Sequence, residues 1–219
     1  MSEGVGLLLI GGEGPSRRVL EPLLPSVTCT VAADSGFDLA RKLQIVPDLL
    51  VGDMDSLEDS QELRDFPTDR IRRYPPAKDE TDAELGLSIL WEMGCERVIL
   101  AGGGGGRLDH LLALVSLFER GKTPSVWYTS REQIQVVEGT HALSNCRGQT
   151  VSFFPIGGMV SGMHSEGLRW PLDGLQWRGG DVGVSNVCLE DRCTVSVRRG
   201  RLLMVRTMGR EKDAGKNEA

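Results

Sequence analysis

The chain has 219 residues, of which 40% are hydrophobic and 26% are charged, so its length allows one large globular domain or two small ones. A formal net charge of −6 and the lack of a long basic run argue against nucleic acid and membranes as partners. The apolar run Val5–Ile10 is too short to span a bilayer and lacks a signal-peptide pattern. It therefore predicts a first strand.

Five cysteines are spread along the chain, and none belongs to a C-x-x-C pair. An odd number without that spacing fits reduced thiols better than a disulfide framework or a structural zinc site. We therefore expect a cytoplasmic protein. The cysteines are Cys29, Cys95, Cys146, Cys188 and Cys193.

Residues 1–124 alternate apolar runs with amphipathic stretches, which predicts a Rossmann-like α/β domain with a mostly parallel sheet. The expected strands are Val5–Ile10, Val27–Ala33, Asp48–Val51, Arg70–Tyr74 and Arg97–Ala101, and the expected helices are Phe37–Leu43, Glu58–Arg64, Asp82–Met93 and Leu108–Arg120. Ligands of open α/β sheets bind outside the carboxyl ends of the strands. We therefore expect the segments that follow the strands to gather at one edge, namely Gly11-Gly12, Asp34-Ser35-Gly36, Gly52-Asp53 and Gly102–Gly106.

Residues 125–208 contain short β-rich runs separated by Gly and Pro, which predicts a small all-β sandwich or barrel domain. The segment Arg198–Arg201 resembles a hairpin turn between the last two strands. Residues 209–219 are polar and predict a flexible tail. The expected strands are Val126–Thr129, Gln133–Val137, Thr150–Pro155, Val184–Leu189, Thr194–Arg198 and Arg201–Thr207.

Two acidic residues, Asp53 and Asp55, follow the short apolar run that ends at Val51. Carboxylates crowded at a strand end repel one another unless a cation lies among them. Mg²⁺ accepts such hard oxygen ligands and is usually held by one or two carboxylates plus substrate phosphates. The pattern indicates a magnesium–phosphate site, although Asp-x-Asp is also common in surface turns.

A second acidic motif opens the helix expected at Asp82, where Asp79 and Thr81 precede the first turn. Thr81 or Asp79 can cap this helix, so the motif has a purely structural interpretation as a capping box. Lys78 stands immediately ahead of these acids. A lysine in that position can meet a phosphate group as a point charge, which favours a binding role.

The glycine run Gly102–Gly106 lies between an expected strand and an expected helix. Glycines let the backbone approach a phosphate closely, and a helix N-terminus attracts anions, but the run alone is equally typical of a flexible turn. Arg107 offers a guanidinium for phosphate, and Asp109 offers a carboxylate for a metal or a cationic ligand. His110 is a candidate catalytic group, but the first turn of a helix favours a structural role for it.

Three residues of the β-rich half are candidates for binding a ring. The indole of Trp170 is a good cation–π surface, although a half-buried tryptophan is ordinary in a core. Ser185 and Asn186 offer the neutral donors and acceptors that a polar heteroaromatic ligand needs.

Taken together and in this order, these segments resemble the thiamine pyrophosphokinase family. The resemblance spans about residues 5–207 and is specific because six weak motifs occur in register. They are Ala33-Asp34-Ser35-Gly36, Gly52–Ser56, Lys78–Leu85, Gly105–His110, Glu166–Leu172 and Ser185-Asn186.

The resemblance implies an N-terminal α/β domain, a C-terminal β domain and Mg²⁺-dependent transfer of a pyrophosphoryl group from ATP to thiamine. It also implies a homodimer whose site lies between the first domain of one subunit and the second domain of the other. The implied metal ligands are Asp53, Asp55 and Asp82. The nucleotide would meet Asp34, Ser35, Lys78, Asp79, Thr81 and Arg107. The thiamine residues would be Asp109, His110, Trp170, Ser185 and Asn186.

The sequence departs from the family pattern at three places. Met54 stands where the family often has Phe, and Gly102–Gly104 has fewer distinctive side chains than family members usually have there. Val187 follows Ser-Asn where an acid is frequent, which bears on substrate preference. Two other functions remain open: a pyrophosphokinase or kinase of a different small alcohol, and a sensor of thiamine or nucleotide without turnover. Three metal carboxylates are more than binding alone requires, which disfavours the sensor.

Overall fold

A computed structural model describes residues 4–54, 61–75, 77 and 79–208 of the chain. The chain divides into two compact units: unit 1 is Met1–Ser130 with Ile134–Val136, and unit 2 is Arg131–Gln133 with Val137–Ala219. Strand β6 (Val126–Tyr128) pairs in parallel with β5 (Cys95–Ala101) and so belongs to unit 1. The predicted boundary between residues 124 and 125 therefore lies before the observed one.

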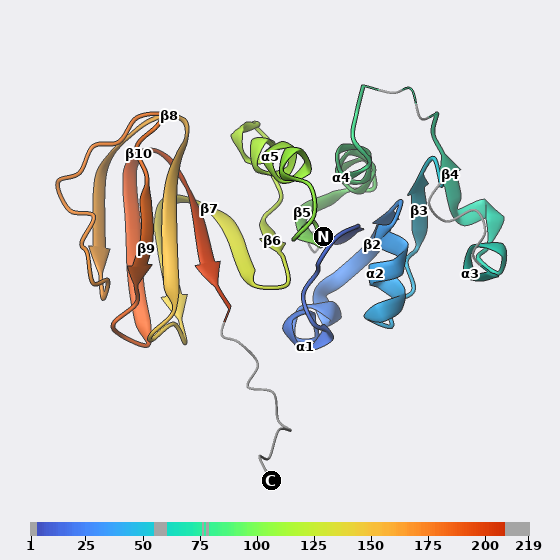
Figure 1. The fold of residues 1–219 in the computed structure, drawn as a ribbon, viewed down its shortest axis with the longest axis horizontal. Helices are drawn as coiled ribbons and strands as arrows, with labels where there is room; N and C mark the ends of the chain where they lie inside the picture. Colours follow the sequence, from blue (N-terminus) through green and yellow to red (C-terminus); the bar gives the residue numbers. More distant parts are fainter. Residues whose placement is uncertain (1–3, 55–60, 76, 78, 209–219) are drawn as a thin grey trace, which may run out of the picture. The chain divides into compact units, whose positions relative to one another are not determined.

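Unit 1 is built on a parallel sheet, as Figure 1 shows. Its strand order is β4-β3-β2-β1-β5-β6, and every neighbouring pair in it runs parallel. The central strand β1 carries Leu7, Leu8 and Leu9, which are almost completely buried because helices cover both faces of such a sheet. The remaining strands are β1 (Gly4–Ile10), β2 (Val27–Ala33), β3 (Leu49–Gly52) and β4 (Ile71–Arg73). The α/β prediction is confirmed.

The helices of unit 1 connect these strands, and the predicted helix 108–120 is divided into α5 and a 3₁₀ turn. No helix in the described part of the chain is long and apolar enough to cross a membrane. The α-helices are α1 (Arg17–Leu20), α2 (Gly36–Lys42), α3 (Gln61–Arg64), α4 (Asp82–Glu92) and α5 (Leu108–Ser116). The 3₁₀ turns are Leu24–Ser26, Thr68–Arg70 and Leu117–Glu119.

Unit 2 is a β structure with the strand order β7-β10-β8-β9. Strand β8 pairs antiparallel with both β10 and β9. Side chains such as Phe153, Val195 and Leu202 are completely buried in its core. The strands are β7 (Glu132–Ser144), β8 (Thr150–Glu166), β9 (Gly183–Val187) and β10 (Arg192–Thr207).

The predicted hairpin turn at Arg198–Arg201 is wrong. The two strands expected on either side of it form one continuous strand, β10, which pairs with β8 along its length. Gly200 marks an irregularity in that pairing, with φ +86°. A Cβ atom there would lie 2.3 Å from the carbonyl oxygen of Met159, so the glycine serves a close backbone approach within the sheet.

Candidate functional site

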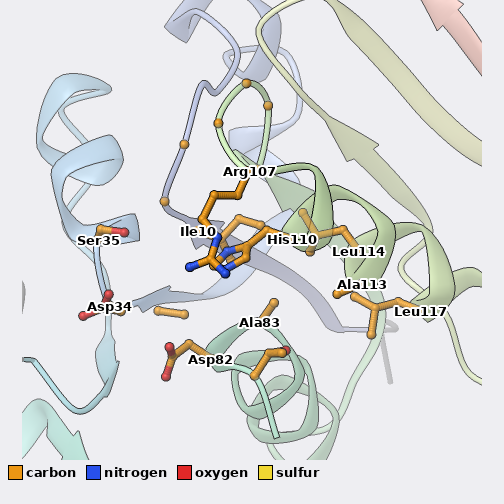
Figure 2. A pocket seen from close by; sticks show the side chains of 18 residues that line it. Ile10, Asp34, Ser35, Asp82, Ala83, Arg107, His110, Ala113, Leu114 and Leu117 are labelled. Carbon is orange, nitrogen blue, oxygen red and sulfur yellow. The ribbon is translucent and has the colours of Figure 1, made fainter. Parts of the chain in front are cut away.

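A cavity of about 410 Å³ opens at the carboxyl ends of the unit 1 strands. Its lining comes from the segments that follow β1, β2 and β5, from the start of α4, and from α5 and the 3₁₀ turn after it, and Figure 2 shows these side chains. The expected gathering of strand ends is confirmed for these three segments. The described lining includes Gly11, Gly12, Asp34, Ser35, Thr81, Asp82, Gly103–Gly106, Arg107 and His110.

The glycine run is fastened to the segment that follows β1. The N–H of Gly103 donates to the carbonyl of Gly11 at 2.8 Å, and Glu13 and Gly104 exchange hydrogen bonds of 2.6 and 3.0 Å. Gly102 has φ +114°, and a Cβ atom on it would lie 2.2 Å from the carbonyl oxygen of Ile10. These contacts fix the backbone and require glycine. They therefore favour the interpretation of the run as a phosphate-binding loop over its interpretation as a flexible turn.

Two carboxylates, those of Asp34 and Asp82, line the cavity. In Figure 2 they lie toward one end of it, while Ala113, Leu114 and Leu117 line the other end. The cavity thus offers a charged end and an apolar end. The apolar residues were not predicted as site residues, although Leu114 and Leu117 stand three apart in a predicted helix.

Asp53 follows β3 and does not line the cavity, but its chain segment is adjacent to it. The N–H of Asp34 donates to the carbonyl of Val51 at 2.8 Å. A Cβ atom added to Gly52 would lie 3.2 Å from Cβ of Asp34. Arg73 donates from Nη1 to the carbonyl oxygen of Asp53 at 3.4 Å. The fourth strand end therefore borders the site through Asp34.

The predicted metal ligands are placed only in part. Asp55 lies outside the described residues, and so does Lys78. Among the residues that are described, the one group of three or more Cys, His, Asp or Glu ligand atoms lying within 4.8 Å of one another is made of cysteines. Asp53 and Asp82 offer hard oxygen donors of the kind that Mg²⁺ binds, but among the described residues no three carboxylates reach that closeness.

The start of α4 has the capping box that the sequence allowed. The hydroxyl of Thr81 accepts the N–H of Glu84 at 3.3 Å, and the Glu84 carboxylate accepts the N–H of Thr81 at 2.7 Å. Burial acts to raise the pKa of Glu84, but the Thr81 hydrogen bonds and the guanidinium of Arg120 together lower that pKa. The capping role of Thr81 is confirmed, whereas Asp79 is exposed.

Arg107, which lines the cavity, forms a bidentate ion pair with Asp109, which does not line it. Nε and Nη2 of Arg107 donate to the two carboxylate oxygens at 3.1 and 2.5 Å. These hydrogen bonds raise the pKa of Arg107 and lower the pKa of Asp109. Both side chains are exposed, so the guanidinium can reach an incoming anion, and His110 lies beside it on the lining (Figure 2).

A second hollow, of about 150 Å³, lies in unit 2 and is lined mainly by apolar and aromatic side chains. Of the three candidate ring-binding residues, Trp170 and Asn186 are part of its lining, but Ser185 is not. The Trp170 side chain is 55% exposed, and the guanidinium of Arg169 lies 5.5 Å from its ring centroid. Ser185 adopts φ +60° and donates its N–H to Ser152 Oγ at 3.0 Å.

The sequence did not single out Trp177, which also lines this hollow with Phe153 and Leu175. The N–H and carbonyl of Trp177 bond to Val160 at 2.9 and 2.7 Å. A Cβ atom on Gly183 would lie 2.5 Å from the Trp177 ring, so that glycine makes room for the indole. The only sequence signal was a second tryptophan seven residues after Trp170.

Both units match family models. Residues 20–127 match the family described as "Thiamin pyrophosphokinase, catalytic domain". Residues 133–202 match "Thiamin pyrophosphokinase, vitamin B1 binding domain". Together these two matches cover most of the chain. The first match ends and the second begins close to the division between unit 1 and unit 2.

Relatives with the same name occur among curated proteins and solved structures. The thiamine pyrophosphokinase of Bacillus subtilis is 25% identical over 187 residues, which cover 82% of this chain and 87% of that protein. The crystal structure of the Bacillus subtilis thiamine pyrophosphokinase has a TM-score of 0.80 at 22% identity and covers 94% of this chain and 99% of its own. That of the Geobacillus thermodenitrificans protein has a TM-score of 0.74 at 25% identity and the same coverage.

Proposed function

The chain belongs to the thiamine pyrophosphokinase family, and we propose that its two cavities divide the substrates of that family's reaction between them. The chain is accordingly an enzyme that transfers the pyrophosphoryl group of ATP to the hydroxyl of thiamine. The hydroxyl oxygen attacks the β-phosphorus, the bond from that phosphorus to the bridging oxygen of the α-phosphate breaks, and AMP leaves. Thiamine diphosphate is the second product.

The unit 1 cavity is the proposed nucleotide site. The observation that carries this assignment is the joining of a fixed glycine loop, a helix N-terminus and Arg107 in one cavity at the strand ends. Lys78 would add a second positive charge. Asp34, Ser35, Asp79 and Thr81 are the other proposed nucleotide residues, and the apolar end near Leu114 suits a ring.

Asp53, Asp55 and Asp82 are the proposed ligands of Mg²⁺. The donor chemistry of Asp53 and Asp82 fits the ion, because Mg²⁺ needs only one or two carboxylates in addition to substrate phosphates. Bound Mg²⁺ would neutralise part of the negative charge on the phosphate oxygens. One of these aspartates would also accept the hydroxyl proton of thiamine, since a carboxylate near the attacking oxygen is the available base.

Arg107 is also proposed to stabilise the leaving group, and its ion pair with Asp109 supports this role. Asp109 holds the guanidinium through two hydrogen bonds, so the cation is oriented before a phosphate arrives. The positive charge of the guanidinium stabilises the negative charge that develops on the leaving AMP. Asp109 and His110 are also proposed to contact thiamine.

The hollow in unit 2, which Trp170 and Asn186 line, is the proposed thiamine site, and Ser185, between two lining residues in the chain, is proposed to contact the same ligand. Thiamine is a cation with two heteroaromatic rings, and the exposed indole of Trp170 offers the π surface that such a cation prefers. The net charge of −6 supports attraction of the same ligand. We further propose that two copies form a homodimer, with unit 1 of one copy and unit 2 of the other completing each site, and that the enzyme acts in the cytoplasm.

Product analysis tests this function. The chain is incubated with ATP, Mg²⁺ and thiamine, and AMP is separated from ADP. We expect AMP and thiamine diphosphate in equal amounts, and we expect EDTA or Asp53→Asn to abolish both. Formation of ADP would instead identify a simple kinase, and thiamine binding without turnover would identify a sensor.

A further inference from the structure

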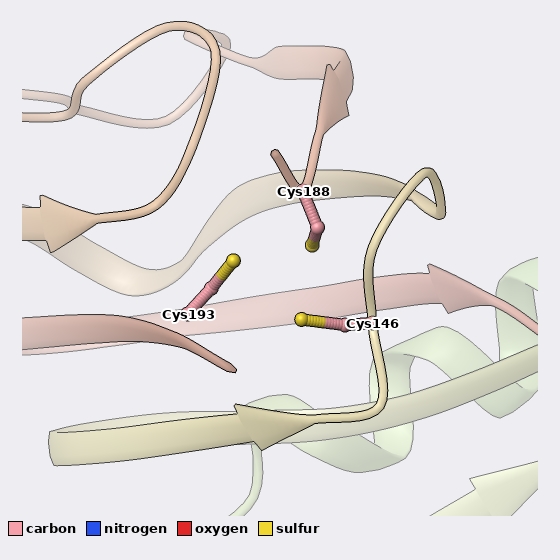
Figure 3. Close-up of side chains that lie close together, drawn as sticks. All are labelled: Cys146, Cys188 and Cys193. Carbon is pink, nitrogen blue, oxygen red and sulfur yellow. The ribbon is translucent and has the colours of Figure 1, made fainter. Parts of the chain in front are cut away.

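Unit 2 contains a cluster of three buried thiols that the proposed reaction does not use. The Sγ atoms of Cys146, Cys188 and Cys193 all lie within 4.8 Å of one another, and none of the three residues has exposed surface. Figure 3 shows them converging from separate segments: the turn after β7, the segment after β9 and the start of β10. In the described chain no other group of Cys, His, Asp and Glu has this arrangement.

The main chain fixes the positions of these cysteines. The N–H of Cys146 donates to the carbonyl of Asp191 at 3.2 Å, and the N–H of Cys188 donates to the carbonyl of Gln149 at 3.0 Å. The carbonyl of Cys188 in turn accepts the N–H of Gly148 at 2.8 Å. The sulfur atoms are therefore brought together by backbone hydrogen bonds that exist without any ligand.

A carbonyl oxygen completes the group. The oxygen of Glu190 lies 3.3 Å from Sγ of Cys146 and 3.7 Å from Sγ of Cys193. In a tetrahedral zinc site with Zn–S near 2.3 Å and Zn–O near 2.1 Å, an oxygen lies about 3.6 Å from each sulfur, and two sulfurs lie about 3.8 Å apart. The two measured oxygen–sulfur distances bracket the tetrahedral value, and the 4.8 Å limit on the sulfur–sulfur separations is within about 1 Å of it.

We propose that Cys146, Cys188 and Cys193, with the carbonyl oxygen of Glu190, bind one divalent thiophilic ion of the zinc class. Sulfur donors select such soft or borderline ions over Mg²⁺, which takes oxygen ligands. Each thiol loses its proton to solvent when it binds, so three thiols and one divalent ion give a complex with one negative charge and three released protons. The site is separate from the proposed Mg²⁺ site, which lies in unit 1.

The surroundings of the thiols explain why an ion would matter. Burial raises the pKa of Cys188 and of Cys193, and contact with the neighbouring thiols adds to this effect at Cys188. The cluster is part of an apolar core that includes Leu143, Leu168 and Leu172. Without a cation the thiols stay neutral there, and a bound ion would join the turn after β7 to the segment between β9 and β10.

Metal titration of the full chain tests the proposal. The protein is purified with a phosphine reductant, treated with a chelator and titrated anaerobically with Cd²⁺, with excess Mg²⁺ present throughout. We expect one Cd²⁺ per chain, a thiolate-to-cadmium charge-transfer band in the ultraviolet, displacement by Zn²⁺, and a higher Tm. Failure to take up the ion, or loss of the ion to Mg²⁺, would overturn the proposal.

Matched cysteine variants locate the ion. Cys188→Ser should weaken Cd²⁺ binding at least roughly 100-fold, because it removes a first-sphere sulfur ligand. Cys29→Ser removes another buried cysteine, in unit 1, and should leave binding unchanged. Equal loss in the two variants, or equal retention, would contradict the assignment.

A measurement on the unaltered chain covers the case in which Cys188→Ser does not fold. X-ray absorption at the zinc edge of the zinc-loaded protein should show three sulfurs and one oxygen around the ion. A shell of oxygen and nitrogen alone would refute the site. An intact mass lower by two hydrogen atoms, with no ion retained, would show a disulfide instead and would also overturn it.

Discussion

Asn186 holds Trp170 through both main-chain polar groups of that residue. Its Oδ1 accepts the Trp170 N–H at 3.1 Å, and its Nδ2 donates to the Trp170 carbonyl at 2.6 Å. Oδ1 also accepts the N–H of Val187 at 2.8 Å, and the side chain is almost fully buried. The amide of Asn186 is thus occupied by the backbone, so it positions the exposed indole beside it.

Replacing Asn186 should therefore weaken thiamine binding and leave nucleotide binding nearly unchanged. Asn186→Leu removes two part-buried hydrogen bonds to the N–H and carbonyl of Trp170, each of which contributes about 0.5–1.5 kcal/mol. We expect the KM for thiamine to rise roughly ten-fold or more, since about 1.4 kcal/mol corresponds to ten-fold. Steady-state kinetics with each substrate varied in turn measures this. Asn145→Gly, at an exposed asparagine with φ +52°, is the control, and an equal rise in both KM values would contradict the positioning role.

Asp82→Asn should remove activity without unfolding the chain. The substitution keeps the shape of a side chain that lines the unit 1 cavity but removes its charge. Loss of a metal carboxylate costs several kcal/mol of transition-state stabilisation, so kcat/KM should fall about 100-fold or more. Asp38→Asn, an exposed acid of α2 that pairs with Arg41 at 3.6 Å, should keep full activity. Normal turnover by the Asp82 variant would exclude this residue as a metal ligand.

Glu84→Gln should destabilise the protein at neutral pH and lose its effect in acid. The folded-state pKa of Glu84 is lowered, so its carboxylate stabilises the fold above its unfolded pKa of about 4.3, and this contribution disappears as pH falls through the folded pKa. We expect a loss of about 0.5–2 kcal/mol at pH 7, the usual value of a cap. Denaturant unfolding at several pH values measures it. Glu92→Gln, at the other end of α4, should show no such loss, and a pH-independent difference for Glu84→Gln would refute the argument.

Gly102→Ala should destabilise unit 1 and impair nucleotide binding. The added methyl group would meet the Ile10 carbonyl at 2.2 Å, and an alanine is strained at φ +114°. Strain of this kind costs about 1–3 kcal/mol. Thermal unfolding and ATP titration measure the two effects. Gly121→Ala has nothing within 4 Å of its new methyl group and should change neither. Unaltered stability of the Gly102 variant would show that the loop can relax.

The sequence predicted the strands of unit 1 well because most of them are apolar runs, β4 (Ile71–Arg73) being the exception. Val27–Ala33 has the predicted bounds, and the other described strands differ by a few residues at their ends. The gathering of Gly11-Gly12, Asp34 and the glycine loop was also predictable, since parallel strands end at a common edge, whereas a site role for Asp82, at the start of a helix, followed only from the family resemblance.

Other features depend on contacts between distant segments and could not be predicted. The Arg198–Arg201 segment has the composition of a turn, and only the pairing partner β8 shows that the strand continues through it. Glu13 gave no signal because its contacts, a backbone exchange with Gly104 and a hydrogen bond from Ser130, join segments distant in the sequence. The three thiols of unit 2 are 42 and 5 residues apart in sequence, which is not a metal-binding spacing, and three-dimensional structure alone brings them together.

The long pairing of β8 with β10 also sets an order for the folding of unit 2. At one end of this ladder Glu166 pairs with Thr194, and at the other end Val151 pairs with Arg206. The first contact closes a much shorter loop, which loses less chain entropy, so the ladder is expected to nucleate there and to zip toward Val151. The loop closed first is the one that carries Trp170 and Asn186. Asn186, however, pairs with Val151 at the far end of the ladder, and Phe153 of that end lines the hollow, so the surface proposed for thiamine is completed only when the whole ladder has closed.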